Sequence, residues 1–350
     1  MRIVTSQSDS VRSTSAAARE STAIKLPVWQ QAMKNAIRNM ADLARFLELS
    51  DDSIVQAEAA VQQFPLFVPQ AFAAKMEKGN PNDPLLLQVL PQQQETVDTK
   101  GFTSDPVGDS SATLSPGLLQ KYHGRALMVV TGACAVHCRY CFRRHFPYSE
   151  SPKGLEAWLP AIEQLAADDS IQEIILSGGD PLTLVDEKLA ILVAELEKIP
   201  HLQRLRIHTR LPIMIPERVN SDLLSWLTGS RLTPVMVVHA NHPHELDEAV
   251  LNSLGQIVDA GVPVLNQAVL LRGVNDDADV LTELCERLVN ARVMPYYLHQ
   301  LDKVTGAAHF EVPKKTGKRL IQQLHGRLPG YAVPRYVEEI QGDVGKVSIQ

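Results

Sequence analysis

The sequence is poor in cysteine, in basic charge and in long apolar runs, and each shortage excludes a class of protein. Four cysteines in 350 residues, three of them in one short stretch, do not make a disulfide framework. No window reaches the roughly 18 consecutive apolar residues of a membrane-spanning helix. A net charge of −6 leaves no basic surface for nucleic acid. The composition, 45% hydrophobic and 21% charged, is typical of a globular protein, and we expect a cytoplasmic, reducing setting.

Strand and helix patterns alternate from Ala126 onward. Six short apolar runs are predicted to be strands: Ala126–Thr131, Glu173–Leu176, Arg204–His208, Pro234–His239, Val262–Leu271 and Met294–His299. Helical patterns lie between them: Leu155–Ala167, Asp186–Ile199, Pro216–Leu227, Glu245–Val258 and Asp276–Val289. This alternation predicts a parallel sheet. Six units are too few for a closed eight-stranded barrel. A doubly wound sheet and an open (β/α)6 barrel both remain possible.

Three cysteines directly follow the first predicted strand. Cys134, Cys138 and Cys141 form the pattern C-x3-C-x2-C, with the aromatic Tyr140 beside the last one. A closed zinc site takes four ligands, so three cysteines are one short. Three thiolates suit an iron–sulfur cube that keeps one iron open to a small molecule. A zinc site with a distant fourth ligand, or three cysteines packed by chance, are the alternatives.

Polar residues follow other predicted strands, at the edge where parallel barrels carry their reactive groups. The run Ser177-Gly178-Gly179-Asp180 follows the second strand. Its glycines would let a ligand approach the backbone closely, and its aspartate suits an amino group. The alternative is an ordinary turn in which the aspartate caps nearby backbone. His208, His239 and His299 each end a strand, and we expect them to line a pocket rather than to bind a metal.

Three further features can be interpreted from the sequence. The first two have two interpretations each, and the third has only a structural one. Arg143 and Arg144 are either surface arginines or a guanidinium fork for a substrate carboxylate. Asn266 and Gln267 interrupt an apolar strand, so their amides face either a ligand or a protein partner. Cys285 lies on an apolar helical face, which predicts a buried core thiol.

The cysteine pattern, with its aromatic residue, resembles the cluster loop of the radical S-adenosylmethionine (SAM) superfamily. Longer motifs from Met76 onward resemble the lysine 2,3-aminomutases: CAVHCRYCFRRHFPY, SGGDPL, RLRIHTRLPI, NQAVLLRGVND, MPYYLHQLDKVTGAAHF and the closing GYAVP…GK. The loop sequence CRYCFRRHFPY and the few residues after Lys346 are similar to the shorter branch linked to elongation factor P modification (EpmB type).

The resemblance implies an α/β fold of the radical SAM type, an open partial (β/α)6 barrel with an N-terminal helical layer. It also implies a short C-terminal segment that carries the lysine for pyridoxal 5′-phosphate (PLP). We therefore predict four parts: a disordered lead-in at 1–25, an N-terminal helical region at 26–117, the barrel at 118–312 and the C-terminal segment at 313–350.

The resemblance also implies roles for individual residues. The [4Fe-4S] cluster would be held by Cys134, Cys138 and Cys141. The cofactor-binding residues would be Ser177, Gly178, Gly179 and Asp180 for SAM, Lys346 and Arg125 for PLP, and Gln267 near both. The substrate carboxylate would bind Arg143, and the side-chain ammonium of lysine would bind Asp302 and Glu339. Glu339 stands where the lysine-fermenting enzymes have an aspartate.

The implied activity is that of an isomerase. It would move the amino group of L-α-lysine from C2 to C3, and an external electron donor would reduce the cluster. A separate lysyl ligase would then use β-lysine to modify elongation factor P. Two rivals remain, a radical SAM enzyme of another rearrangement that lacks PLP, and a non-catalytic iron–sulfur or zinc protein. We expect no nucleic-acid and no membrane partner.

Overall fold

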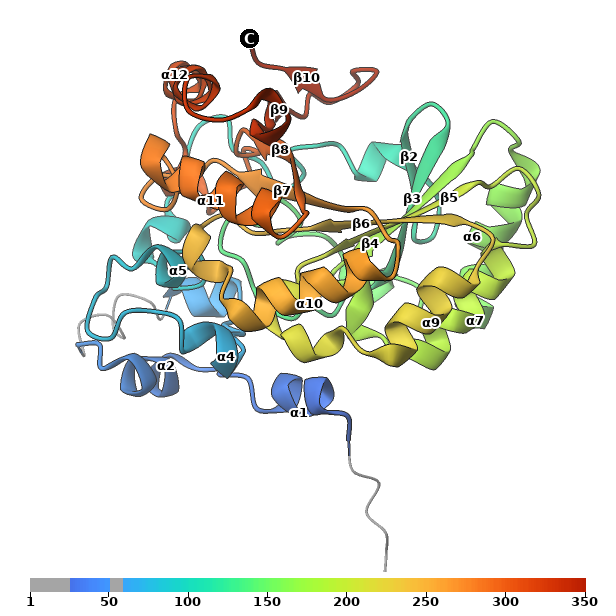
Figure 1. Ribbon diagram of the computed structural model, residues 1–350, viewed down its shortest axis with the longest axis horizontal. Helices are drawn as coiled ribbons and strands as arrows, with labels where there is room; N and C mark the ends of the chain where they lie inside the picture. Colours follow the sequence, from blue (N-terminus) through green and yellow to red (C-terminus); the bar gives the residue numbers. More distant parts are fainter. Residues whose placement is uncertain (1–25, 51–58) are drawn as a thin grey trace, which may run out of the picture.

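The computed structural model describes residues 26–50 and 59–350, so the predicted lead-in at 1–25 lies outside the described residues. The centre of the fold is one sheet whose ten strands are ordered as they occur in the sequence (Figure 1). The strands are β1 Thr113–Ser115, β2 Leu118–Tyr122, β3 Arg125–Thr131, β4 Glu173–Gly178, β5 Arg204–Thr209, β6 Thr233–Val238, β7 Val264–Val269, β8 Met294–His299, β9 Arg335–Glu338 and β10 Val347–Ser348.

The strand order decides between the two folds that the pattern left open. Strands β3 to β9 are parallel, and each new strand adds to the same edge of the sheet. A doubly wound sheet would reverse its strand order at a switch point. In the part of the chain that the structure describes, no pairing joins β1 to β10, so the sheet stays open. The open partial barrel is therefore confirmed.

Helices connect the parallel strands, and α7, α9 and α10 lie on one side of the sheet, where α7 packs against α9 (Figure 1). The connecting helices are α6 Leu155–Ala167, α7 Asp186–Leu196, α8 Leu211–Met214, α9 Ser221–Gly229, α10 Glu248–Asp259, α11 Ala278–Asn290 and α12 Lys314–His325. The N-terminal helices are α1 Val28–Lys34, α2 Met40–Leu47, α4 Gln70–Ala73 and α5 Pro84–Leu87.

Strand β3 shows how the sequence separates core from site. Side chains along a strand alternate between its two faces. Ala126, Met128 and Val130 belong to the main hydrophobic core, together with Trp158 of α6. Leu127, on the opposite face, lines the interior cavity. The strand therefore packs against its helix on one side and faces the cavity on the other.

Three helices, α9, α10 and α11, start later than predicted, because a side chain caps each of them later in the sequence. The helix predicted from Pro216 is broken, since the Asn220 side chain accepts a hydrogen bond from Leu223 N at 2.8 Å and starts α9 there. Likewise the Asp247 side chain accepts from Val250 N at 3.0 Å, so α10 begins at Glu248 and not at Glu245. An N-cap of this kind stabilises a helix by about 1 kcal/mol.

Four strands of the sheet were not predicted. Strands β1 and β2 precede the first predicted strand, and β9 adds a seventh parallel strand to the six that were predicted. Strand β10 pairs antiparallel with β9 through Val347 and Glu338. Lys346 therefore lies between two paired strands, which hold it close to the barrel.

Candidate active site

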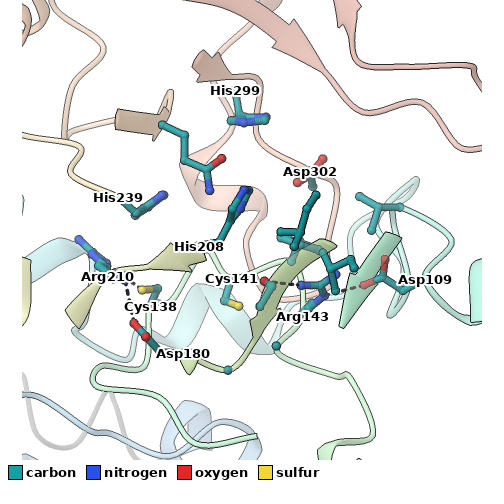
Figure 2. Close-up of a pocket in the computed structure, with 18 of the residues that line it drawn as sticks. Asp109, Cys138, Cys141, Arg143, Asp180, His208, Arg210, His239, His299 and Asp302 are labelled. Atoms are coloured by element: carbon teal, nitrogen blue, oxygen red, sulfur yellow. Dashed lines mark hydrogen bonds and ion pairs between the residues drawn. The ribbon is translucent and has the colours of Figure 1, made fainter. Parts of the chain in front are cut away.

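A cavity of about 420 Å³ opens at the carboxyl ends of the parallel strands (Figure 2). Every site residue that the sequence predicted lines it: Arg125, Cys134, Cys138, Cys141, Arg143, Ser177, Gly178, Gly179, Asp180, Gln267, Asp302, Glu339 and Lys346. These residues come from segments more than 200 positions apart in the chain. The fold brings them together because parallel strands end at one edge.

A buried ion cluster anchors the cysteine loop. The carboxylate of Glu95 accepts from Arg139 Nε at 2.9 Å and from Arg144 Nη2 at 2.7 Å. All three side chains are fully buried. Arg144 also donates to the carbonyl oxygens of Arg139 and Gly306. Both interpretations of Arg144 are therefore wrong. It is not a surface residue, and because it binds Glu95 it is not free to bind a substrate carboxylate. It braces the loop from within.

The three cysteines influence one another. Burial raises the pKa of the Cys134 thiol, and the charges of Cys141, Asp180 and Cys138 raise it further. Burial likewise raises the pKa of Cys141 to about 11, with Cys138 adding to the effect. Thiols in such a site ionise when a metal takes the place of their protons. The site thus suits a positively charged centre.

The described residues bear on which kind of metal centre the three thiols could hold. Among residues 26–50 and 59–350, no three His, Cys, Asp or Glu side chains converge as ligands of one metal ion. A cube of irons needs a wider triangle, because each thiolate binds a different iron. Zinc would need four ligands that meet at one point. The zinc alternative therefore finds no support among the described residues.

The two glycines at the end of β4, the last residue of the strand and the one after it, let the cysteine loop pack against this strand. Gly178 has φ +119°, and a Cβ on Gly179 would lie 2.2 Å from the carbonyl oxygen of Ala133. Gly179 N and Asp180 N donate to the carbonyl oxygens of Thr131 and Ala133 at 2.8 and 2.7 Å. Any side chain at Gly179 would push the loop away. The glycines therefore set the distance between the cysteines and the end of β4.

The carboxylate of Asp180 binds the protein through both oxygens. Its Oδ1 accepts from Leu182 N at 3.0 Å and from Thr209 Oγ1 at 2.7 Å, and its Oδ2 accepts from Arg210 N at 2.7 Å. Burial raises its pKa despite these bonds. These contacts match the capping alternative. The role of Asp180 toward SAM stays a prediction.

Arg143 is oriented by a residue that the sequence did not single out. Its Nε donates to Asp109 Oδ2 at 2.7 Å, and its Nη1 lies 3.3 Å from Ser177 Oγ (Figure 2). Lys121 Nζ forms a second ion pair with Asp109 at 2.7 Å. Asp109 is buried, and Arg143 and Lys121 hold the pKa of its carboxyl below the usual range although burial opposes ionisation. The guanidinium thus stays fixed at the cavity wall.

Lys346 pairs with the carboxylate predicted to bind the substrate ammonium. Its Nζ donates to Glu339 Oε2 at 2.6 Å, and Tyr122 Oη donates to the other oxygen, also at 2.6 Å. Burial opposes ionisation of Glu339, but Lys346, Tyr122 and Lys121 outweigh it, so the pKa of this carboxyl is lowered. The side chain of Lys346 is only 26% exposed, which excludes a freely solvated tail.

Asp302 contrasts with Glu339, because the pKa of its carboxyl is raised and not lowered. Among the described residues, no side chain forms an ion pair or hydrogen bond with its carboxyl, although the charge of Lys346 lowers its pKa and that of Glu339 raises it. Burial is the larger effect and raises its pKa to about 7. A buried carboxyl of this kind gains most from an incoming cation. Figure 2 shows it facing the cavity.

The remaining candidates separate into lining and structural residues. His208, His239 and His299 line the cavity as predicted, and burial lowers the pKa of each. Asn266 is structural, since it exchanges hydrogen bonds with the backbone of Ala240 at 2.9 and 3.0 Å. Cys285 is 2% exposed in a core cluster, which confirms the predicted core thiol.

The residues that sequence reasoning missed are Glu95, Asp109, Lys121, Tyr122 and Arg210. No motif or periodicity marks the first four. Arg210 follows β5 and could have been found by the strand-end rule that selected the histidines.

Comparison with known proteins identifies the class. The sequence model of the radical SAM superfamily matches residues 128–285. The chain is 46% identical over 318 residues to an L-lysine 2,3-aminomutase of Haemophilus influenzae, covering 91% of this chain and 94% of that protein. It is 44% identical to the Escherichia coli L-lysine 2,3-aminomutase over 92% of this chain and 94% of that protein. With the Clostridium subterminale enzyme it shares 33% identity over 92% of this chain and 77% of that protein.

A partial barrel with three cysteines on the loop after its first parallel strand defines a radical SAM enzyme, a class that uses a [4Fe-4S] cluster and SAM. Within that class the chain belongs to the family of the L-lysine 2,3-aminomutases, which are isomerases. Its identity to the Haemophilus and Escherichia proteins, 46% and 44%, exceeds the 33% that it shares with the clostridial one, which groups it with the former two. No described helix has the length and apolar character needed to cross a membrane.

Proposed function

We propose that this chain converts L-lysine to β-lysine by moving the 2-amino group to C3, with a [4Fe-4S] cluster, SAM and PLP as cofactors. The observation that supports it is one cavity that brings together the three cysteine thiols, the amine of Lys346, the guanidinium of Arg143 and the carboxyls of Asp302 and Glu339. A radical SAM enzyme without PLP would not need a lysine amine at this position.

The cofactors would divide the cavity between them. Cys134, Cys138 and Cys141 would hold the cluster, Gly178 and Gly179 would border SAM, and Lys346 would carry PLP, with Arg125 and Gln267 nearby. When bound, the cluster with SAM supplies hydrogen-atom removal, and PLP supplies the π-system that lets the nitrogen migrate. The protein supplies position, charge and the exclusion of water.

Arg143 would hold the substrate carboxylate. Asp109 accepts from the guanidinium Nε at 2.7 Å. Because the guanidinium is planar, this bond also fixes the direction of the remaining N–H donors. A guanidinium can grip a carboxylate with two parallel charge-assisted bonds, which an ammonium cannot reproduce. The anchor would therefore fix the backbone end of the substrate before chemistry begins.

Asp302 would bind the ammonium at the other end. Its pKa near 7 means that the empty site carries a partly protonated carboxyl. An arriving ammonium favours the ionised form, so binding of lysine would release a proton from Asp302 below that pH. Glu339 is already ionised beside Lys346. It would hold Lys346 Nζ in place and become available to the substrate once that nitrogen is engaged by PLP.

Apolar residues complete the chamber. Leu127, Ile175, Val269 and Leu301 line the same cavity as the charged groups. Their presence lowers the local dielectric, which strengthens each charge contact and keeps water from reactive species.

We propose a cytoplasmic setting, an external electron donor for the cluster, and use of β-lysine by a lysyl ligase on elongation factor P. The four predicted parts of the chain remain proposals.

The test is an anaerobic incubation of the reconstituted protein with L-lysine, SAM, PLP and dithionite, followed by chiral chromatography. We expect β-lysine from lysine, little product from ornithine and none from norleucine, because the two anchors require a full-length side chain with a terminal charge. Turnover of norleucine at the rate of lysine would contradict the anchor assignment. Absence of any lysine product from protein with a full cluster would contradict the proposed activity.

The variant Lys346→Ala tests the PLP assignment separately. We expect it to keep its iron and SAM binding but to lose the visible imine absorbance and the PLP adduct that borohydride traps. The matched control is Lys121→Ala, which removes another cavity lysine and should retain the trapped adduct. A trapped adduct in Lys346→Ala at the wild-type level would show that another lysine binds PLP.

A further inference from the structure

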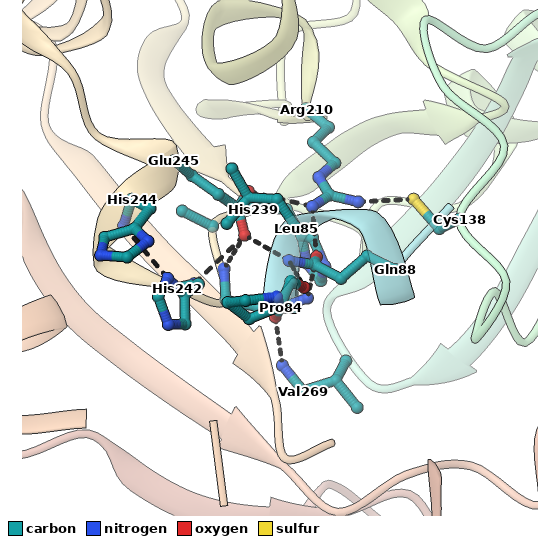
Figure 3. A network of polar contacts seen from close by, with 12 residues as sticks. Pro84, Leu85, Gln88, Cys138, Arg210, His239, His242, His244, Glu245 and Val269 are labelled. Carbon is teal, nitrogen blue, oxygen red and sulfur yellow. Dashed lines mark hydrogen bonds and ion pairs between the residues drawn. The ribbon is translucent and has the colours of Figure 1, made fainter. Parts of the chain in front are cut away.

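A buried polar network joins the cysteine loop to the N-terminal helices (Figure 3). At its centre is Arg210, which follows β5 and is 7% exposed. Its Nη1 donates to Cys138 Sγ at 2.8 Å. Its Nη2 donates to Gln88 Oε1 at 2.6 Å and to Glu245 Oε2 at 2.9 Å. One guanidinium thus touches a predicted cluster ligand, the residue after α5 and the turn before α10.

The partners of Arg210 are themselves held. Glu245 is fully buried, and its Oε1 accepts from Gln88 Nε2 at 3.0 Å and from the backbone nitrogens of Asn241 and His242 at 2.9 and 3.1 Å. These bonds fix one carboxylate oxygen and leave the other for Arg210. Because the guanidinium is planar, fixing Nη2 also fixes the direction of Nη1. The hydrogen bond to Cys138 is therefore determined by groups outside the cysteine loop.

We propose that Arg210 is a positioning residue that orients the Cys138 thiolate and raises the reduction potential of the cluster. The proposal rests on the cluster of the proposed function but not on the lysine reaction. Cys138 binds iron as an anion, and reduction adds a further negative charge to the centre. A guanidinium that donates to the sulfur stabilises this added charge, so reduction becomes easier.

The network predicts opposite effects for its two charged members. Arg210→Gln removes the positive charge and the bond to sulfur, so the cluster becomes harder to reduce. Glu245→Gln removes the negative charge that offsets Arg210, so the cluster becomes easier to reduce. A residue that only supported the loop would change the iron content. It would not shift the reduction potential in opposite directions in these two variants. The sign difference therefore separates electrostatic tuning from structural support.

The experiment is a spectroelectrochemical titration of the reconstituted cluster, without lysine or PLP. We expect the reduced-to-oxidised ratio at fixed potential to fall about tenfold in Arg210→Gln, which is about 59 mV for one electron. Arg210→Lys keeps the charge but cannot reach all three partners, so its shift should be smaller. Glu245→Gln should shift the ratio the other way. The matched control is Arg218→Gln, since Arg218 is equally buried but bonds to Asp186 and to carbonyl oxygens.

The outcomes decide the proposal. Potentials of Arg210→Gln and Arg210→Lys equal to the wild type would overturn it, as would an equal shift in Arg218→Gln. If Arg210→Gln does not retain iron, Arg210→Lys and Glu245→Gln carry the test, and shifts of the same sign in both would overturn it. A failure to form β-lysine would leave these potentials unchanged, so the two proposals fail separately.

Discussion

The cysteine loop and the segment around Lys346 line the same cavity, yet they are held in different ways. The loop is one continuous stretch in which Arg139, between two of the cysteines, and Arg144, just after the last one, are buried against Glu95. The other side is assembled from distant segments, and Lys346 and Lys121 there are 26% and 21% exposed. A cluster needs permanent geometry, whereas a substrate must enter and leave. The side of the cavity formed by the cysteine loop, called the rigid side, is therefore held by fully buried ion pairs. The side around Lys346, called the exchanging side, is held by ion pairs whose lysines are partly exposed.

The largest expected effect concerns the cysteines. Cys134→Ala, Cys138→Ala and Cys141→Ala should each abolish activity, since loss of one thiolate leaves an iron unheld. Cys285→Ala should retain full activity and lose only modest stability, because Cys285 packs in the core. Iron content and turnover measured on the four proteins check this. Normal iron and turnover in any loop variant would show that the rigid side does not hold the cluster.

The bracing of the rigid side predicts a large loss of stability for Glu95→Gln. This variant leaves Arg139 and Arg144 buried without their carboxylate, and breaking a buried pair in this way costs roughly 3–5 kcal/mol. The matched control is Glu283→Gln, which breaks an exposed helical pair with Arg287 and should cost about 0.5 kcal/mol or less. Urea unfolding followed by circular dichroism measures both. Equal, small losses would contradict a stabilising role for the buried ion pairs of Glu95 with Arg139 and Arg144.

On the exchanging side, Asp302→Asn should weaken kcat/KM for lysine at least tenfold. Removing one partner of a desolvated charge pair costs roughly 2–5 kcal/mol, and about 1.4 kcal/mol already corresponds to a factor of ten. PLP occupancy and cluster content should persist, since neither depends on Asp302. Steady-state kinetics on wild type and variant test this. Unchanged kcat/KM for lysine would remove Asp302 from the ammonium site.

The smallest effect is a pH dependence of stability. The pKa of Asp302 is raised from 3.8 to about 7 by burial, so the folded protein binds its proton more tightly than the unfolded chain does. The resulting stabilisation is present below about pH 4 and is lost as the pH rises through 7. Asp302→Asn should therefore raise the melting temperature of the ligand-free protein at pH 8 more than at pH 5. An equal change at both pH values would contradict the raised pKa.

The same contrast explains what the sequence could predict. The cysteines, the two glycines and the strand rhythm lie in contiguous patterns, and the resemblance placed Lys346, Asp302 and Glu339 in one site. The supporting residues pair over long separations, such as Arg143 with Asp109 at 34 positions and Gln88 with Glu245 at 157. Such pairs have no local period. The stretch 331–340 is extended in pattern, but the four residues of β9 within it carry too short an alternation to mark a further parallel strand of the sheet.

The most direct test of the central claim follows the nitrogen atom itself. L-lysine labelled with ¹⁵N at the 2-amino group is incubated anaerobically with the holoenzyme, SAM, PLP and dithionite, together with unlabelled ammonium. We predict that nuclear magnetic resonance detects ¹⁵N bonded to C3 of the product at full enrichment, since the amino group moves within one bound molecule between fixed anchors. Label that stays on C2, or a 3-amino group diluted by ammonium from solution, would contradict an intramolecular shift in this cavity.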